Sequence, residues 1–258
     1  RLGADDVPVK IDENFTSEFG MRFAAAFRLT ADPPPSQPIK FRLPVSELFG
    51  ARVDVPTSLL IWTTTPWTLP SNAAVAVNPA ETYVLVELRH EDDRERMVLG
   101  KGCLGNVFGA DAGDLYTVVA EFPGSALLGQ KYAPPFDFVA AADVAPGPNA
   151  WTVLPAEFVA LDEGTGIVHM APAFGEDDYT MGVRYKLPFF QPIDTAGQFT
   201  AAVGDWQGQF VKDADPSITE DLKRRGLLLR ADRYEHTYPF CWRCDSPLLY
   251  YARESWFV

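Results

Sequence analysis

The sequence predicts an α/β fold rich in strands, with a β-barrel core, a few peripheral helices and extended β-ribbon arms at both termini. Short β-branched and aromatic runs, each bounded by Gly, Pro, Asn or Asp, recur along most of the chain. Only two segments carry the start and stop signals of helices. Because many strands and few helices are expected, a closed sheet with helices on its outside is the favoured architecture.

The first 50 residues are expected to form an N-terminal arm around a proline-rich loop. The segment ADPPPSQP at 31–38 can be neither a helix nor a central strand, because proline lacks a backbone N–H and restricts the residue before it. An alternating apolar and polar pattern predicts a strand at 39–43. Further short runs predict strands at 59–63, 73–77, 83–88, 116–121, 152–154 and 166–170.

Two segments have the pattern of helices. The first spans about 176–186, carries acidic residues in its first turn, where the helix dipole is positive, and is followed by Pro188. The second is predicted to begin at Pro216 with Asp215 as its N-cap, and to end before Gly226.

Composition excludes several classes of protein. The chain has 258 residues, 47% hydrophobic and 22% charged, which is typical of a folded globular protein. It has no apolar run of about 18 residues, so we expect no membrane span, and its start lacks the apolar core of a secretory signal. It begins with Arg1 rather than Met, from which we expect a piece of a longer protein.

The charge balance limits how the chain can contact nucleic acid. A net charge of −13 argues against the wrapping of a long duplex, because phosphate binding requires a basic surface. Contact with a short nucleic-acid end remains compatible with this negative charge. The basic run at 223–225, with Arg230 and Arg233, either contacts phosphates or forms a solvated helix face, which is the commoner case.

The cysteines favour a reducing cytoplasm over a secreted disulfide framework, because their number is odd. Cys241 and Cys244 form a CxxC pair, which is half of a tetrahedral zinc site. Cys103 or His236 could supply further ligands, and a second pair could lie outside this sequence. Two thiols without a metal is the alternative that we favour for this chain.

A cluster of hydroxyls lies in WTTTPWTLPSN at 62–72, where a predicted buried strand ends. Threonine hydroxyls are weak acids, so they orient a water or a substrate oxygen rather than ionise. Pro66 and Pro70 stiffen the loop and favour a preorganised site. The alternative is a threonine run of high β-propensity that enters a proline turn.

The second polar segment is GTGIVHMAPAFGEDDY at 164–179. We expect a strand that carries His169 outward, where it can hydrogen-bond a ligand, and an acid at the mouth of the next loop that can hold an ammonium group. The alternative is a satisfied core histidine and acids that match the helix dipole. The sequence contains neither GxGxxG nor GxxxxGK[ST] for phosphate, and no GxSxG nucleophile elbow.

Together these segments resemble the editing domain of isoleucyl-tRNA synthetases, a large insertion in the catalytic core of class I synthetases. The threonine-rich segment matches one editing peptide and 164–179 matches the second, whereas YPFCWRCDSPLLYYARESWF at 238–257 resembles the return to the catalytic core. The resemblance covers about 59–258. The sister domains for valine and leucine have Arg where Thr65 stands here, which favours the isoleucine family.

The resemblance implies three parts: the arm at 1–50, the editing domain at 51–235, and a return strand at 236–258. The synthetic motifs HIGH and KMSKS are absent, so ATP binding and aminoacylation are expected only of a full-length synthetase. Zinc bound by the CxxC pair is likewise expected only there. No cofactor is expected for this chain itself.

The resemblance also assigns roles to individual residues. Asp178 corresponds to the acid that pairs with the substrate's α-ammonium group, whereas Asp177 could merely serve the helix dipole. His169 corresponds to a wall of the side-chain pocket that sets size discrimination. Trp67 belongs to the substrate-binding set and is expected to pack beneath the threonine loop, as we call the threonine-rich segment at 62–72. The polar residues expected around the ester and the terminal ribose are Thr63, Thr64, Thr65 and Asn72.

The implied function is hydrolytic proofreading of mischarged tRNA(Ile), an aminoacyl-tRNA deacylase activity. An oriented water would hydrolyse valyl-tRNA(Ile), and valyl-adenylate is an open second substrate. The general base is open between the vicinal ribose hydroxyl and a side chain. The expected partners are the 3′ end of the tRNA with its valyl group and terminal adenosine, and the rest of the synthetase chain. A cytoplasmic monomer without membrane contact is expected.

Three alternatives remain at this point. The first is an editing domain of another specificity, such as threonyl esters. The second is a module that binds the tRNA end without turnover. The third is a small zinc-binding interaction module built on the two cysteines of the CxxC pair.

Overall fold

A six-stranded sheet forms the largest layer of the protein. The computed structural model describes residues 21–26, 39–89, 94–109, 115–142, 144, 147–231, 241–243 and 247–254. Its strands are β1 (Met21–Ala26), β2 (Ile39–Leu48), β3 (Ala51–Thr63), β4 (Ala74–Val77), β5 (Thr82–Arg89), β6 (Arg94–Gly100), β7 (Tyr116–Pro123), β8 (Val153–Pro155), β9 (Val168–Met170), β10 (Leu228–Ala231) and β11 (Leu249–Glu254). Its α-helices are α1 (Leu104–Phe108), α2 (Phe138–Ala141), α3 (Glu176–Tyr185) and α4 (Val211–Arg224). Short 3-10 helices are η1 (Pro66–Ser71), η2 (Lys101–Cys103), η3 (Gly124–Leu127) and η4 (Ala201–Trp206).

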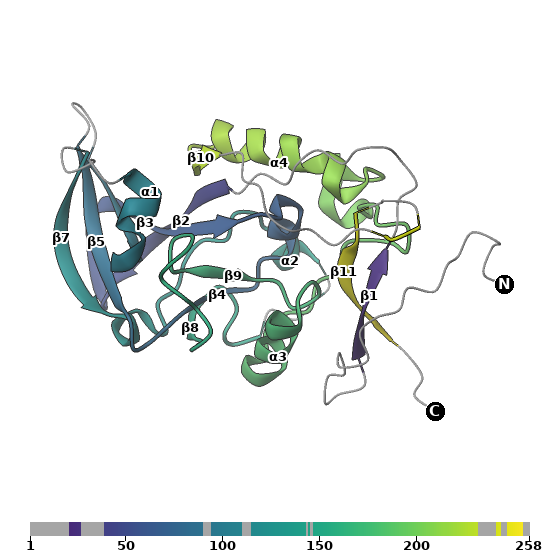
Figure 1. Ribbon diagram of the computed structural model, residues 1–258, viewed down its shortest axis with the longest axis horizontal. Coiled ribbons are helices and arrows are strands. Elements are labelled where there is room, and N and C mark those ends of the chain that lie inside the picture. The colour runs from purple at the N-terminus through teal and green to yellow at the C-terminus, as the bar shows by residue number, and fades with distance from the viewer. Residues whose placement is uncertain are drawn as a thin grey trace.

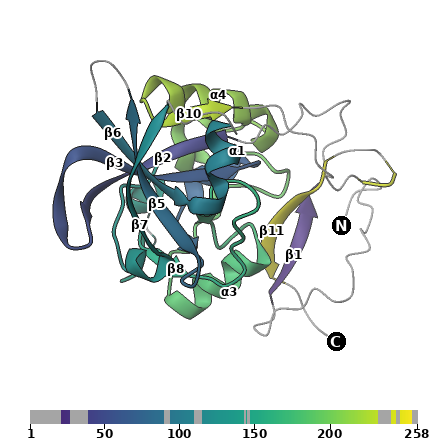
Figure 2. The ribbon, with the colours of Figure 1, turned by 60° about the vertical axis from the view of Figure 1, so that its left-hand side comes forward.

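The strands form three sheets. The six-stranded sheet has the order β10-β2-β3-β6-β5-β7, in which only β3 and β6 pair in parallel. A three-stranded sheet has β4 between β8, which is parallel to it, and β9, which is antiparallel. The helices α4 and α3 lie on opposite sides of these sheets (Figures 1 and 2). The fold is therefore a strand-rich α/β fold with peripheral helices, as predicted, whereas closure into a barrel stays a prediction.

Strands β1 and β11 form a separate antiparallel pair, from Met21 opposite Glu254 to Ala26 opposite Leu249. Figure 1 shows this pair at the end of the molecule away from β5 and β7. The proline-rich segment 31–38 and most of the predicted arms lie outside the described residues. The three predicted domain boundaries therefore stay predictions.

All strands predicted from 39–43 to 166–170 are found, although β2 ends five residues later and β3 begins eight residues earlier than predicted, and the other ends shift by at most two residues. The prediction missed β6, because its first residues are charged and its burial begins only at Met97. It also missed β10, which is short and half-exposed. Among the described helices, none has the length and apolar character needed to cross a membrane.

Helix α4 begins at Val211, so the prediction that it starts at Pro216 was wrong. Asp215 and Pro216 look like an N-cap and a first helical residue, but both lie inside the helix. An interior proline costs about 3 kcal/mol. The first turn compensates by placing Val211 and Ala214 in the core, on the same buried face as Ile218.

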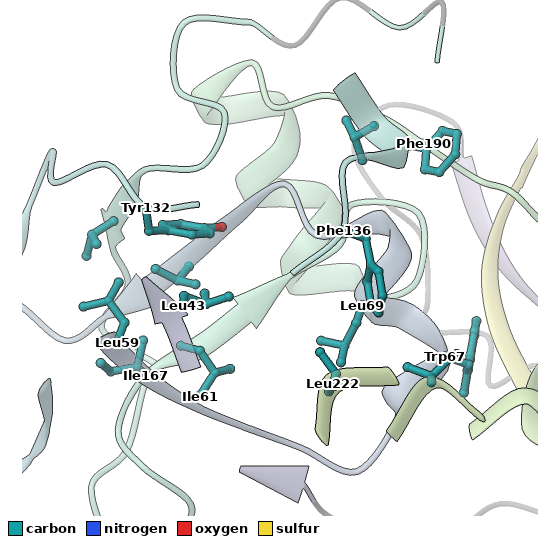
Figure 3. Packing of buried hydrophobic residues seen from close by; sticks show 14 of the residues in the cluster. Leu43, Leu59, Ile61, Trp67, Leu69, Tyr132, Phe136, Ile167, Phe190 and Leu222 are labelled. Atoms are coloured by element: carbon teal, nitrogen blue, oxygen red, sulfur yellow. The ribbon is translucent and has the colours of Figure 1, made fainter. Parts of the chain in front are cut away.

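Helix η1, which follows the threonines at the end of β3, is anchored in the apolar core (Figure 3). Helix η1 contributes Trp67 and Leu69 to the main cluster of buried side chains, and α4 packs against it with residues that include Leu222. Leu69 is fully buried, so its replacement by alanine should cost about 2–5 kcal/mol. The loop that follows β3 is therefore fixed between the sheet and α4.

Candidate active site

One cavity of about 240 Å³ lies where the end of β3, the threonine loop, β9 and the start of α3 meet. It is lined by Trp62, Thr63, Thr64, Thr65, Thr68, Val168, His169, Ala171, Phe174 and Asp178. The two polar segments singled out in the sequence, at 62–72 and 164–179, thus form one site although about 100 residues separate them. Of the predicted site residues, the three consecutive threonines, His169 and Asp178 line this cavity.

The threonine hydroxyls form an ordered row at the end of β3. Thr63 Oγ1 accepts a hydrogen bond from the backbone N–H of Thr65 at 3.1 Å. Thr65 Oγ1 lies 3.3 Å from Thr63 Oγ1 and 3.4 Å from Thr68 Oγ1. Pro66 then begins η1 with its fixed φ, which sets the direction of the turn. Thr64, between Thr63 and Thr65 in the sequence, also lines the cavity.

His169 is buried, with 9% of its surface exposed, so the prediction that the strand carries it outward was wrong. Its neighbour Val168 takes the exposed position, because successive side chains of a strand point to opposite faces. The imidazole Nε2 lies 2.8 Å from Thr68 Oγ1, and Nδ1 lies 3.2 Å from Asn72 Nδ2. Burial lowers the pKa of His169 to about 4, so the ring is neutral at pH 7.

Asn72 lies behind His169 and is almost fully buried, so its side chain is not among those that line the cavity. Its Nδ2 donates to the carbonyl of Ala74 at 3.1 Å, and its Oδ1 accepts from the hydroxyl of Tyr132 at 2.7 Å. The amide is therefore engaged by protein partners rather than placed beside an ester. The structure therefore does not bring Asn72 to the wall of the cavity, and its predicted contact with the substrate stays a prediction.

Asp178 joins the start of α3 to the end of β9. It lies in the first turn of α3, and its Oδ1 accepts a hydrogen bond from the backbone N–H of Ala171 at 2.6 Å. A Cβ at Gly175, the N-cap of α3, would lie 2.5 Å from Asp178 Oδ2. Burial raises the pKa of Asp178 to about 7, against the opposing effect of the backbone hydrogen bond. A carboxylate held in this way gains from a cationic partner in the cavity.

Trp67 is buried in the core beneath the loop, as predicted, and does not line the cavity. Its ring packs edge-to-face on Phe174, with centroids 4.9 Å apart, and Phe174 is a cavity wall. The Trp67 backbone N–H donates to Asp215 Oδ1 at 2.8 Å, which explains why this acid is not an N-cap. Burial raises the pKa of Asp215 to about 7, and the nearby Lys212 opposes that shift. Trp67 thus supports the site from behind.

Sequence reasoning missed several lining residues. Thr68 lies inside the threonine-rich segment, but its contact with His169 depends on a strand about 100 residues away. Trp62 and Phe174 supply the aromatic walls. Both lie next to the polar residues in the sequence, and this position was the available signal that they could line the same cavity. Asp177, by contrast, is exposed at the start of α3, where it matches the helix dipole.

The zinc prediction stays a prediction. Within the described ranges, no group of three or more His, Cys, Asp or Glu side chains could hold a metal ion. Cys241 is a buried free thiol, and Cys103 donates to the carbonyl of Leu161. Cys244 and His236 lie outside the described residues.

The basic run on α4 is paired with acids of the same helix. Lys223 forms an ion pair with Glu220, and Arg224 and Arg225 both pair with Asp221. The sequence left open whether these residues contact phosphates or form a solvated helix face. The ion pairs within α4 favour the solvated helix face. Arg233 lies outside the described residues.

Curated proteins share extended sequence similarity with this chain. The isoleucine–tRNA ligase of Chlamydia abortus is 46% identical over 203 residues, or 79% of this chain. That of Nocardia farcinica is 48% identical over 218 residues, or 83% of this chain. The chain is a homologue of one segment of the isoleucine–tRNA ligase family. It spans about a fifth of the length of these relatives, 19% in both cases. No protein-family model matches the chain.

Two solved structures of synthetase editing domains have folds similar to that of this chain. The editing domain of the cytosolic leucyl-tRNA synthetase of P. knowlesi aligns with 80% of this chain and 99% of its own, with a TM-score of 0.56 and 12% identity. GlLeuRS-CP1 aligns with 78% of this chain and 99% of its own, with a TM-score of 0.55 and 16% identity. At this identity the likeness concerns the fold alone. The homologue of isoleucine–tRNA ligases therefore has the fold of a synthetase editing domain.

Proposed function

We propose that this chain is a proofreading domain that binds the aminoacylated 3′ adenosine of tRNA(Ile) and hydrolyses its valyl ester. The observation that carries this proposal is the cavity that joins the threonine row, His169 and Asp178. A hydroxyl-rich wall, a neutral imidazole and a half-buried carboxylate match an amino acid ester, which has an oxygen-rich centre, an apolar side chain and an ammonium group. The homology to isoleucine–tRNA ligases supplies the amino acid class.

Asp178 is proposed to bind the α-ammonium group of the substrate. A free amino acid ester carries this charge, whereas a peptidyl ester does not. The cavity of about 240 Å³ is smaller than the roughly 300–1,000 Å³ of pockets that enclose drug-sized ligands. It therefore suits the aminoacyl group, with the nucleotide outside it. This division fits a chain that receives only the end of a tRNA.

His169 is proposed to exclude the isoleucyl side chain by size. Hydrogen bonds to Thr68 and Asn72 hold the ring at both nitrogens, so this wall has little freedom to move. Forcing one more methylene against a packed wall costs about 1–3 kcal/mol. A valyl group would fit where an isoleucyl group would clash.

The hydrolysis is proposed to use a water oriented by the threonine hydroxyls. The water oxygen bonds to the ester carbonyl carbon, the bond from that carbon to the ribose oxygen breaks, and the products are valine and a tRNA with a free terminal hydroxyl. The described lining residues include no serine or cysteine, so we propose no covalent intermediate. Both nitrogens of His169 are engaged, so we assign the proton transfer to the vicinal ribose hydroxyl, which accepts a proton from the attacking water and passes its own proton to the departing ribose oxygen.

The rest of a full-length synthetase is the proposed holder of the tRNA body. The chain has a net charge of −13 and its basic run on α4 is paired with acids, so phosphate contacts should add little affinity here. We expect weak binding of tRNA by this chain alone. The monomeric state, the cytoplasmic location and the absence of a cofactor in this reaction belong to the same proposal.

The proposal is tested by measuring deacylation of valyl-tRNA(Ile) and isoleucyl-tRNA(Ile) by the purified chain. We expect faster release of valine, and loss of that activity in Asp178→Ala with folding retained. Equal release of both amino acids, or full activity of Asp178→Ala, would contradict the assignment. Binding of a non-hydrolysable valyl-adenosine analogue without turnover of valyl-tRNA would identify a tRNA-end binding module instead.

A further inference from the structure

Tyr132 is a buried residue outside the two polar segments, and its side chain is not among those that line the cavity. Figure 3 shows its ring within the apolar cluster, with the hydroxyl oxygen at the free end. That hydroxyl donates to Asn72 Oδ1 at 2.7 Å. Burial raises the pKa of Tyr132 far above its ordinary value, so the phenol keeps its proton and can serve as a donor.

The carbonyl of Ala74 fixes the orientation of the Asn72 amide, because a carbonyl only accepts and must therefore face Nδ2, which leaves Oδ1 to accept from the Tyr132 hydroxyl. With Oδ1 facing the phenol, Nδ2 faces the carbonyl of Ala74 at 3.1 Å and His169 Nδ1 at 3.2 Å. Both groups must therefore act as acceptors from Nδ2, since an amide nitrogen only donates. His169 Nδ1 consequently carries no proton, and the neutral ring carries its proton on Nε2.

The same direction continues to the threonine row. Thr68 has one hydroxyl hydrogen, and it donates that hydrogen to the carbonyl of Thr65 at 2.9 Å. Thr68 Oγ1 therefore accepts from His169 Nε2–H, 2.8 Å away. Four side chains thus form a relay with one direction of donation, from Tyr132 through Asn72, the C-cap of η1, and His169 of β9 to Thr68 of η1.

We propose that Tyr132 is a positioning residue that, through Asn72, holds His169 as a fixed wall of the cavity and thereby determines which acyl group is admitted. The effect on acyl-group selection rests on the proposed function, whereas the hydrogen-bond relay itself does not depend on any activity. Without the Tyr132 hydroxyl, Asn72 Oδ1 is left buried without its donor, and the hold of Asn72 on His169 Nδ1 loosens. The ring can then give way to a larger side chain.

The first test reads the His169 tautomer by long-range ¹H–¹⁵N NMR of protein with ¹⁵N-labelled histidine, a residue that occurs three times in the chain. His169→Gln identifies the signal. The relay predicts the Nε2–H tautomer in the wild type. In Asn72→Asp a carboxylate replaces the donor, so a proton should appear on Nδ1. The Nδ1–H tautomer in the wild type, or an unchanged signal in Asn72→Asp, would overturn the relay.

The second test compares Tyr132→Phe with Tyr83→Phe as a matched control. The Tyr83 hydroxyl is also buried and donates to the carbonyl of Gly166 at 2.7 Å, away from the cavity. We expect the ratio of kcat/KM for valyl- over isoleucyl-tRNA(Ile) to fall by up to about tenfold in Tyr132→Phe and to stay unchanged in Tyr83→Phe. A purely structural defect would lower both rates together and leave the ratio unchanged, which would overturn the role of Tyr132.

Two outcomes separate this inference from the proposed function. If the wild type hydrolyses neither ester, the proposed function fails, and the ratio of dissociation constants for valyl- and isoleucyl-adenosine analogues replaces the rate ratio. If Tyr132→Phe does not fold, the same ratio is measured in Asn72→Ala, which removes the next member of the relay. An unchanged ratio there would also contradict the positioning role.

Discussion

The Asp178 carboxylate accepts a hydrogen bond from the backbone N–H of Ala171 at 2.6 Å, which connects the first turn of α3 to the residue that follows β9. This bond holds an acid at the wall of the cavity although its burial disfavours the charged form. Asp178 is thus held in position, and a cationic ligand in the cavity would stabilise its charged form. Its position and its protonation are separately testable.

The protonation of Asp178 predicts a pH dependence. Burial raises the pKa of Asp178 from 3.8 to about 7, so the charged form that binds an ammonium group becomes dominant only above that pH. We expect kcat/KM for valyl-tRNA(Ile) to rise between pH 6 and pH 7.5, and Asp178→Asn to lack this rise and to be about 10–100-fold less active. An identical profile in both proteins, measured by release of labelled valine, would remove Asp178 from binding.

The pKa of Asp178 also has a consequence for stability. Because the folded protein holds this proton more tightly than the unfolded chain, the contribution of Asp178 to the free energy of unfolding falls as pH rises from about 4 to about 7. Urea denaturation of the wild type and of Asp178→Asn should show a smaller decrease for the variant over that range. A steeper decrease in Asp178→Asn would have the wrong sign.

Gly175 tests the position of Asp178 without changing its charge. In Gly175→Ala the new Cβ would lie 2.5 Å from Asp178 Oδ2, so the carboxylate that Ala171 holds through Oδ1 must move. We expect kcat/KM for valyl-tRNA(Ile) to fall at least about tenfold. Gly105→Ala in α1 is the control, because its Cβ meets no atom within 4 Å. Equal activity of the two variants would show that the carboxylate position is unimportant.

His169→Ala should widen the cavity and admit the longer side chain. Removal of the ring leaves space beside Thr68 and Asn72, which are its hydrogen-bond partners. We expect hydrolysis of isoleucyl-tRNA(Ile) to increase by roughly 10–100-fold, the range that one methylene accounts for. The check is the initial rate of isoleucine release, with circular dichroism to confirm folding. If His169→Ala still rejects isoleucyl esters, another residue of the cavity wall must exclude the larger side chain.

Asp215 should stabilise the threonine loop through the Trp67 backbone. Burial raises the pKa of Asp215 to about 7, so at pH 6 the wild-type carboxyl is mostly neutral, and asparagine resembles it. We expect Asp215→Asn to be close to wild type in thermal unfolding at pH 6. Asp215→Ala leaves the Trp67 N–H without its acceptor and should cost about 1–3 kcal/mol. Equal unfolding free energies of Asn and Ala variants would show that this hydrogen bond is dispensable.

Local patterns predicted those parts of the site that depend on neighbouring residues. The threonines follow a strand pattern and precede a proline, and Asp178 stands in the first turn of a helix with clear signals. Both segments could therefore be located and their chemistry anticipated. Their meeting in one cavity was implied by the family resemblance, since no local pattern contains it.

The features that were missed depend on long-range packing. The orientation of His169 could not be read from β9, because three residues are too few to show alternation against neighbours. The place of Asn72 behind the cavity follows from Tyr132, which is 60 positions away and belongs to no motif. The start of α4 was misplaced because Asp215, which accepts from Trp67, has the sequence pattern of an N-cap.

Whether this cavity binds an aminoacyl ester is tested most directly by a crystal structure of the chain with a non-hydrolysable valyl-adenosine analogue. We expect the α-ammonium group to lie within hydrogen-bond distance of Asp178, the isopropyl group to contact His169, and the carbonyl to face the threonine row. An analogue that binds away from this cavity, or one that binds within it with its ammonium group turned away from Asp178, would contradict the account.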